Sequence, residues 1–105
     1  MSKNVKTYES LSDLPWEPTR PGKIIQQDIL ERFGLSQEQL RQHLHVSRKT
    51  VNELVVGKRG ITPEMSLRLA LLTGQSAEYW LNLQSQYDLW RARSTHTEMD
   101  ITPLF

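Results

Sequence analysis

The side chains best suited to chemistry in this sequence are hydrogen-bond donors within one short stretch. Arg48 and Lys49 can donate to the O6 and N7 atoms of guanine or to a phosphate, and the Asn52 amide matches the N6 and N7 atoms of adenine. Thr50 can touch a thymine methyl group or a phosphate. Glu53 would have to accept a hydrogen bond from a cytosine or point away from the bases, and we expect it to point away. These residue types at this spacing predict a surface that reads double-stranded DNA.

A second set of residues suits phosphate oxygens. The sequence Gly-Lys-Arg-Gly supplies Lys58, Arg59 and the N–H of Gly60, which we interpret as a phosphate clamp, with a solvated basic turn as the alternative. Ser47 is expected first to cap a helix, although its hydroxyl could also reach a phosphate. The charge distribution agrees, because residues 36–62 hold five Lys or Arg against two Glu, whereas the whole chain carries a net charge of only +1.

Two short amphipathic helices must hold these side chains. Ser36 begins the first, with Gln39 three residues later in capping-box spacing, and Ser47 begins the second. Their buried positions are expected at Leu40, Leu44, Val51, Leu54 and Val55. A short break separates the two helices, so the pair predicts a helix-turn-helix whose second helix can lie in a DNA major groove.

Three further helices are predicted around this pair, which makes the expected fold all-α with five helices. One begins at Pro21 and carries an apolar residue at every fourth position. These positions are Ile25, Ile29 and Phe33. Another begins at Thr62 and is apolar on nearly all sides, including Leu67 and Leu71, which predicts a central helix. The last begins at Ser76.

The last predicted helix carries a continuous aromatic-rich stripe. Trp80, Leu83, Tyr87 and Trp90 share one side of it. A domain of five helices seldom needs so much aromatic area in its own core. We therefore expect one side of this helix to pack on the core and the other to form a homodimer interface through the stripe. The alternative is that the whole helix closes a single core.

Length and composition favour one domain with extensions at both ends. We expect an N-terminal arm at 1–19, a DNA-binding and dimerisation domain at 20–93, and a C-terminal tail at 94–105. Three arm residues are more apolar than a passive tail requires, and they either pack on the domain or become ordered on a partner. They are Leu11, Leu14 and Trp16.

Several function classes are disfavoured by what the sequence lacks. It contains no cysteine, which removes thiol catalysis and thiolate metal sites. His43 and His45 are two residues apart and would point to different sides of a helix, so we expect no metal. We find no phosphate loop, nucleophile motif, apolar leader or membrane-spanning run, so a cytoplasmic protein that is not an enzyme and holds no cofactor is expected.

Three phrases carry a resemblance to a known family: RPGKII at 20–25, VNELVVGKRGIT at 51–62 and SAEYWLNLQSQYDLW at 76–90. Together with LSQEQL at 35–40, they resemble the HigA-type antitoxins of bacterial toxin–antitoxin modules, a branch of the Xre/Cro-like helix-turn-helix repressors. The resemblance extends over roughly residues 20–91. An Xre/lambda-repressor-like domain is the fold that it implies.

The resemblance also implies a function. A protein of this family is a homodimer that binds a palindromic operator, represses its own operon and neutralises a HigB-type toxin, an mRNA endonuclease with a RelE-like fold. Gln37 resembles the glutamine with which this repressor class clamps a phosphate. An Xre-like transcription regulator without a toxin partner is the alternative.

One residue departs from the family pattern. The turn of the helix-turn-helix usually carries glycine, whereas this chain has His45, which tolerates the left-handed conformation at modest cost.

The toxin-binding surface could be the arm, the first helix, or the outer side of the last two helices. We favour the arm with the first helix, because Leu11, Leu14 and Trp16 have no other evident purpose.

Overall fold

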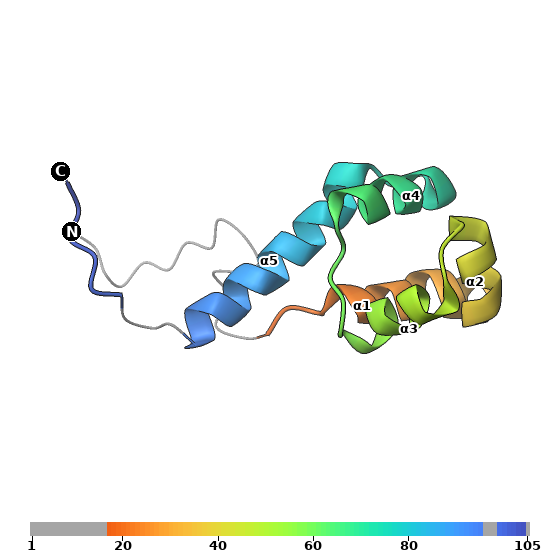
Figure 1. Cartoon of the computed structure of the whole chain (residues 1–105), viewed down its shortest axis with the longest axis horizontal. Helices are drawn as coiled ribbons and strands as arrows, with labels where there is room; N and C mark the ends of the chain where they lie inside the picture. Colours follow the sequence, from red (N-terminus) through yellow and green to blue (C-terminus); the bar gives the residue numbers. More distant parts are fainter. Residues whose placement is uncertain (1–16, 96–98, 105) are drawn as a thin grey trace.

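The structure, a computed structural model, describes residues 17–95 and 99–104, and this part of the chain consists of helices without a strand. The helices follow in the order α1 (Pro21–Ile25), η2 (Gln26–Glu31), α2 (Gln37–Leu44), α3 (Arg48–Val56), α4 (Pro63–Thr73) and α5 (Ala77–Thr95). They form a small bundle from which α5 extends (Figure 1). Because η2 continues α1 without a break, the predicted all-α fold with five helices is confirmed.

Capping interactions determine where α2 and α3 begin. Ser36 Oγ accepts a hydrogen bond from the Gln39 N–H at 3.0 Å, and the Gln39 side chain accepts one from the Ser36 N–H at 2.9 Å, which is the predicted capping box. Ser47 Oγ accepts from the Thr50 N–H at 3.0 Å and caps α3. Between the two helices, His45 adopts the expected left-handed conformation, with φ 59° and ψ 46°.

Arg68 of α4 supports this turn. Its Nη1 donates to the carbonyl oxygen of Leu44 at 2.8 Å and to that of His45 at 3.4 Å. The last carbonyl groups of an α-helix have no partner within the helix, and a cation there also complements the helix dipole. Arg68 therefore links α4 to the turn that sets the angle between α2 and α3.

The predicted apolar stripe on the first helix is wrong at Phe33. Ile25 and Ile29 are buried as expected, but Phe33 is 64% exposed and Leu30 is buried instead. The cause is η2, a π-helical segment, because hydrogen bonds from residue i to i+5 widen the turn and shift the inward side. Phe33 stands at the surface, where the Arg32 guanidinium lies 5.6 Å from the ring centre.

The predicted central position of α4 is also wrong. It buries Met65 and Leu69 but leaves Leu67 59% and Leu71 89% exposed, so α4 lies at the surface of the bundle. The core is formed instead by all the helices together. Its buried residues are Ile25, Ile29, Leu30, Leu40, Leu44, Val51, Leu54, Val55, Ile61, Met65, Leu69 and Trp80.

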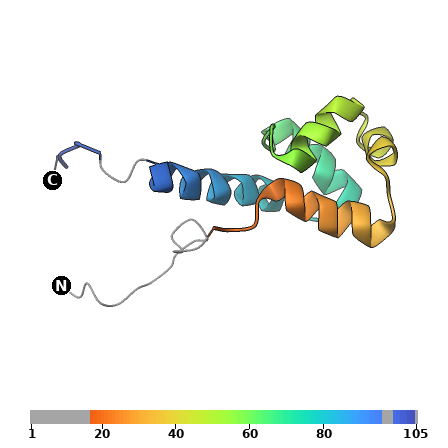
Figure 2. The ribbon, with the colours of Figure 1, turned by 90° about the horizontal axis from the view of Figure 1, so that it is seen from below.

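Only the first part of α5 packs on this core. Trp80 is 2% exposed, and its Nε1 donates to Thr73 Oγ1 at 3.2 Å. Leu83 is partly buried against the core, and the remaining turns extend past the bundle (Figures 1 and 2). Among the described residues, no helix combines the length and the apolar character that a membrane span needs.

The two ends of the described chain differ. Pro18 is buried before α1 begins, whereas residues 99–104 are exposed and have no regular structure. The candidate toxin-contact residues Leu11, Leu14 and Trp16 lie outside the described residues.

Candidate nucleic-acid interface

The outward side of α3 carries the side chains predicted to read bases. Val51, Leu54 and Val55 are buried in the core, which turns the opposite side of the helix outward. Three polar side chains are exposed there and Thr50 is half-buried. The exposed three are Arg48, Lys49 and Asn52. All four lie in the first half of α3, the end of a recognition helix that contacts base edges.

Hydrogen bonds hold part of this surface in place. Ser47 Oγ, which caps α3, lies 2.9 Å from Thr50 Oγ1, so the Ser47 hydroxyl is engaged in the cap as expected. The Asn52 amide donates to Gln37 Oε1 at 3.3 Å across 15 positions of sequence. The contact joins the start of α2 to α3. It places the predicted phosphate ligand Gln37 beside the predicted base-reading residue Asn52.

The segment that follows α3, residues 57–60, is here called the basic loop. Gly57 ends α3 in the left-handed conformation, and the N–H groups of Lys58 and Arg59 both donate to the Glu53 carbonyl oxygen, at 2.9 and 3.1 Å. All four residues of the loop are exposed. The turn therefore holds Lys58, Arg59 and Gly60 at the surface beyond the end of α3.

Ion pairs reduce the number of available cations. Arg59 Nη2 lies 2.8 Å from Glu53 Oε1, and this hydrogen bond holds the pKa of the Glu53 carboxyl below its ordinary value. Arg41 pairs with Glu38 at 2.8 Å on α2 in the same way. Within the described residues, the ion pairs leave three cations of this region without a carboxylate partner. They are Arg48, Lys49 and Lys58.

The ion pair between Glu53 and Arg59 was not predicted. Sequence reasoning expected Glu53 to point away from bases and Arg59 to be available for a phosphate. In the structure the two side chains bind each other instead. The turn at Gly57 brings the loop back over the last turns of α3, so that Arg59 donates to the Glu53 carboxylate. Six positions separate the two residues, a spacing that helix periodicity does not pair.

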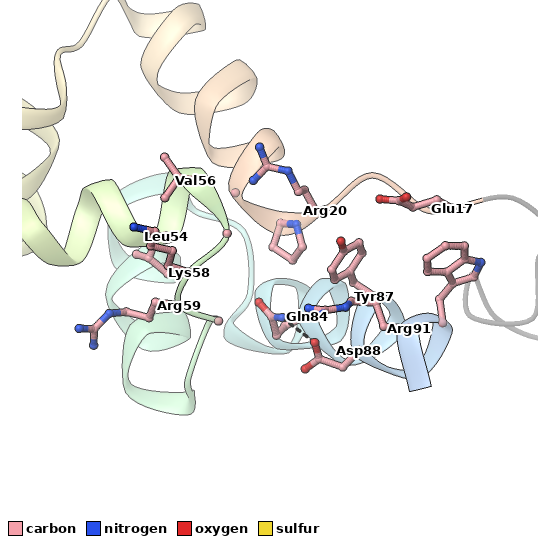
Figure 3. Close-up of a pocket in the computed structure, with 15 residues that line it drawn as sticks. Glu17, Arg20, Leu54, Val56, Lys58, Arg59, Gln84, Tyr87, Asp88 and Arg91 are labelled. Atoms are coloured by element: carbon pink, nitrogen blue, oxygen red, sulfur yellow. Dashed lines mark hydrogen bonds between the residues drawn. The ribbon is translucent and has the colours of Figure 1, made fainter. Parts of the chain in front are cut away.

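A groove of about 640 Å³ lies between the basic loop, the start of α1 and α5 (Figure 3). Arg20 borders it and donates from Nη1 to the Val55 carbonyl oxygen at 2.7 Å, which ties α1 to the end of α3. Gln84, Tyr87 and Arg91 line the α5 side, with the Arg91 guanidinium 5.9 Å from the Tyr87 ring centre. Sequence reasoning missed Arg20 and Gln84, since an isolated polar residue gives no periodic signal.

The predicted dimer stripe divides between two environments. Trp80 is in the core of this chain and Leu83 packs against that core, so both already have contacts. Tyr87 and Trp90 are half-buried and line the groove, and Leu89 is 47% exposed beside them. The outer turns of α5 therefore present the part of the stripe that remains accessible.

Comparison with known proteins gives consistent matches over this region. A family model described as helix-turn-helix matches residues 27–80. Virulence-associated protein I of Dichelobacter nodosus is 41% identical over 77% of this chain and 75% of its own length. Antitoxin HigA-1 of Vibrio cholerae is 32% identical over 84% of this chain and 85% of its own.

A solved structure matches as well. The Pseudomonas aeruginosa antitoxin HigA, solved with the higBA promoter, is 38% identical and superposes with a TM-score of 0.75. The match covers 84% of this chain and 99% of that one. This match covers more of the chain than the helix-turn-helix family model, which spans residues 27–80.

Proposed function

This chain belongs to the helix-turn-helix family and to its HigA-type branch, and we propose that it binds a palindromic operator as a dimer, represses its own operon and neutralises a HigB-type toxin. On this assignment it acts in the cytoplasm by binding, without a catalytic step or a cofactor. The observation that supports DNA binding most directly is the exposed polar start of α3, joined to Gln37 by the Asn52 amide.

Each residue of the interface receives a role from its chemistry. Arg48 and Lys49 are assigned to guanine or phosphate, Asn52 to adenine, and Thr50 to a thymine methyl group or a phosphate. The remaining residues are assigned to the DNA backbone, where they fix the position of the domain without reading sequence. They are Gln37, Ser47, Lys58, Gly60 and Arg59, and for Arg59 this contact requires release from its ion pair with Glu53.

Selection of bound duplexes from a random pool tests the DNA-binding proposal. A dimer should enrich a palindrome whose half-sites lie about one helical turn, ~34 Å, apart. Enrichment of a single half-site would contradict the dimer, and no enrichment would contradict sequence reading. Binding that falls steeply with added salt is expected, because contacts to phosphates release counterions.

We assign the dimer contact to the outer turns of α5, where Tyr87, Leu89 and Trp90 lie beyond the bundle. Leu83 borders this surface, whereas Trp80 is already buried in the core. Aromatic side chains bury large areas and dominate interface energetics, so their accessible position supports this assignment. Sedimentation of the wild-type protein should give a dimer, and a monomer at micromolar concentration would contradict it.

The toxin contact is assigned to the N-terminal arm with the first helix. Deletion of residues 1–16 removes Leu11, Leu14 and Trp16 but keeps Pro18, which is buried, and Arg20, which contacts the end of α3. The truncated protein should fail to copurify with a co-expressed HigB-type protein while still binding its operator. Intact copurification would exclude the arm. If the full-length chain binds no such protein, a regulator without a toxin partner is the remaining function.

A further inference from the structure

At the groove of Figure 3, Gln84 connects α5 to the residue that directly follows the basic loop. Gln84 of α5 accepts a hydrogen bond from the Ile61 N–H at 2.8 Å through Oε1, and its Nε2 donates to Asp88 Oδ1 at 2.9 Å. Ile61 directly follows the basic loop and is buried in the core. We propose that Gln84 is a positioning residue for DNA binding, which holds the basic loop where it can contact phosphates.

Asp88 determines the orientation of the Gln84 amide. A carboxylate can only accept hydrogen bonds, so it attracts Nε2 and leaves Oε1 facing the N–H of Ile61. Gln84 and Asp88 are four positions apart on α5, neighbours on the same side of the helix. The pair therefore presents a fixed acceptor to the Ile61 N–H at the end of the loop, which an isolated amide free to rotate would not.

The amide also packs against the basic loop itself. A Cβ atom placed on Gly60 would stand 3.1–3.3 Å from three atoms of the Gln84 amide, closer than ordinary packing allows. The other end of the loop is held by Glu53, whose carbonyl oxygen accepts from Lys58 and Arg59. The loop is thus fixed by α3 on one side and by α5 on the other.

This arrangement gives α5 a second role beside the proposed dimer contact. Tyr87 and Trp90 follow Gln84 by one to two turns along the same helix. The helix that sets the distance between two reading units would then also set the position of each basic loop. The inference rests on the proposed function, because it requires the loop to contact DNA phosphates.

The salt dependence of DNA binding tests the proposal, with full-length variants and a duplex selected from a random pool. Gln84→Ala is expected to weaken binding about threefold to tenfold, the value of a typical hydrogen bond. It should also flatten the salt slope by about one phosphate contact, as Lys58→Ala should. The two changes combined should cost little more than the larger one alone, because both remove the same contact.

A matched control and an exchange of the pair separate positioning from stability. Asn82→Ala removes another amide from α5, one that is exposed, and should change neither affinity nor slope. Gln84→Glu places two carboxylates side by side and should weaken binding. In the double variant Gln84→Glu with Asp88→Asn, the new amide at 88 donates to the carboxylate at 84, and that carboxylate still accepts from the Ile61 N–H. The net charge equals that of the wild type. Affinity and salt slope should therefore recover.

Three results would overturn the inference, and the last of them also overturns the proposed role of the loop. If Gln84→Ala lowers the melting temperature but keeps the wild-type salt slope while Lys58→Ala changes it, Gln84 has only a structural role. An exchanged pair that binds as weakly as Gln84→Glu would also mean that Gln84 has only a structural role. If Lys58→Ala itself leaves the slope unchanged, the basic loop does not contact phosphates, and the proposed role of the loop fails together with that of Gln84.

Discussion

Gly22→Ala gives the clearest test of how the first helix supports the reading unit. A Cβ atom at this position would stand 2.6 Å from the Val55 carbonyl oxygen and closer still to that of Leu54. Both atoms belong to the backbone of α3 and cannot rotate away. The same region holds the hydrogen bond from Arg20 to Val55. The methyl group would therefore force α1 and α3 apart where Gly22 faces these two carbonyl groups.

The sign of the change in the free energy of unfolding shows whether packing or helix propensity dominates at this position. Alanine is the better helix former by about 1 kcal/mol, which taken alone predicts a more stable protein. Overpacking costs about 1–3 kcal/mol and occasionally more, and rigid backbone acceptors favour the upper end. We expect a net loss of about 2 kcal/mol in the free energy of unfolding, or a melting temperature lower by about 8–16 °C for a domain of this size.

Urea and thermal unfolding followed by circular dichroism measure this loss. Lys23→Ala is the matched control, because Lys23 is the next residue and is exposed, so its change should stay within about 0.5 kcal/mol. Stability of Gly22→Ala equal to or above that of the wild type would refute the close approach of α1 to α3. Operator binding measured well below the melting temperature should also weaken, since the displaced carbonyl groups belong to the end of the reading helix.

Three further predictions follow from other contacts. His45→Val should lower the free energy of unfolding by about 1–2 kcal/mol in urea titrations, because a β-branched residue fits the left-handed region poorly, whereas His45→Gly should not destabilise by more than about 1 kcal/mol. Glu53→Gln should release Arg59 from its ion pair, so that the protein binds random DNA more tightly and the salt slope of that binding steepens by up to about one. An unchanged slope would mean that Arg59 stays away from phosphates. Tyr87→Ala with Trp90→Ala should shift sedimentation toward the monomer without lowering the helix content, and a persistent dimer would place the subunit contact elsewhere.

The sequence predicted the features of this fold that depend on local chemistry. The caps at Ser36, Ser47 and Thr62 are present as expected, and so is the left-handed His45. Each depends on a side chain and the backbone within a few residues of it, which a single sequence displays directly.

Features that depend on distant contacts or on a change of helix type were not predictable in this way. The π-helical turns of η2 place Phe33 at the surface, and no pattern of residues in the sequence predicts a π-helix there. The links from Arg20 to Val55 and from Gln84 to Ile61 each join segments more than 20 positions apart. The candidate reading residues were placed on one helix side by periodicity alone, whereas their partners came from tertiary packing.

The central claim is that the exposed start of α3 reads the bases of an operator, and Asn52→Ala measures it most directly. Binding of the variant to the selected duplex and to a scrambled duplex should be compared by gel shift at one salt concentration. We expect a loss of about 1–3 kcal/mol on the selected duplex, with relaxed preference at one base pair and little change on the scrambled duplex. Equal affinity of the variant and the wild type for the selected duplex would contradict the claim.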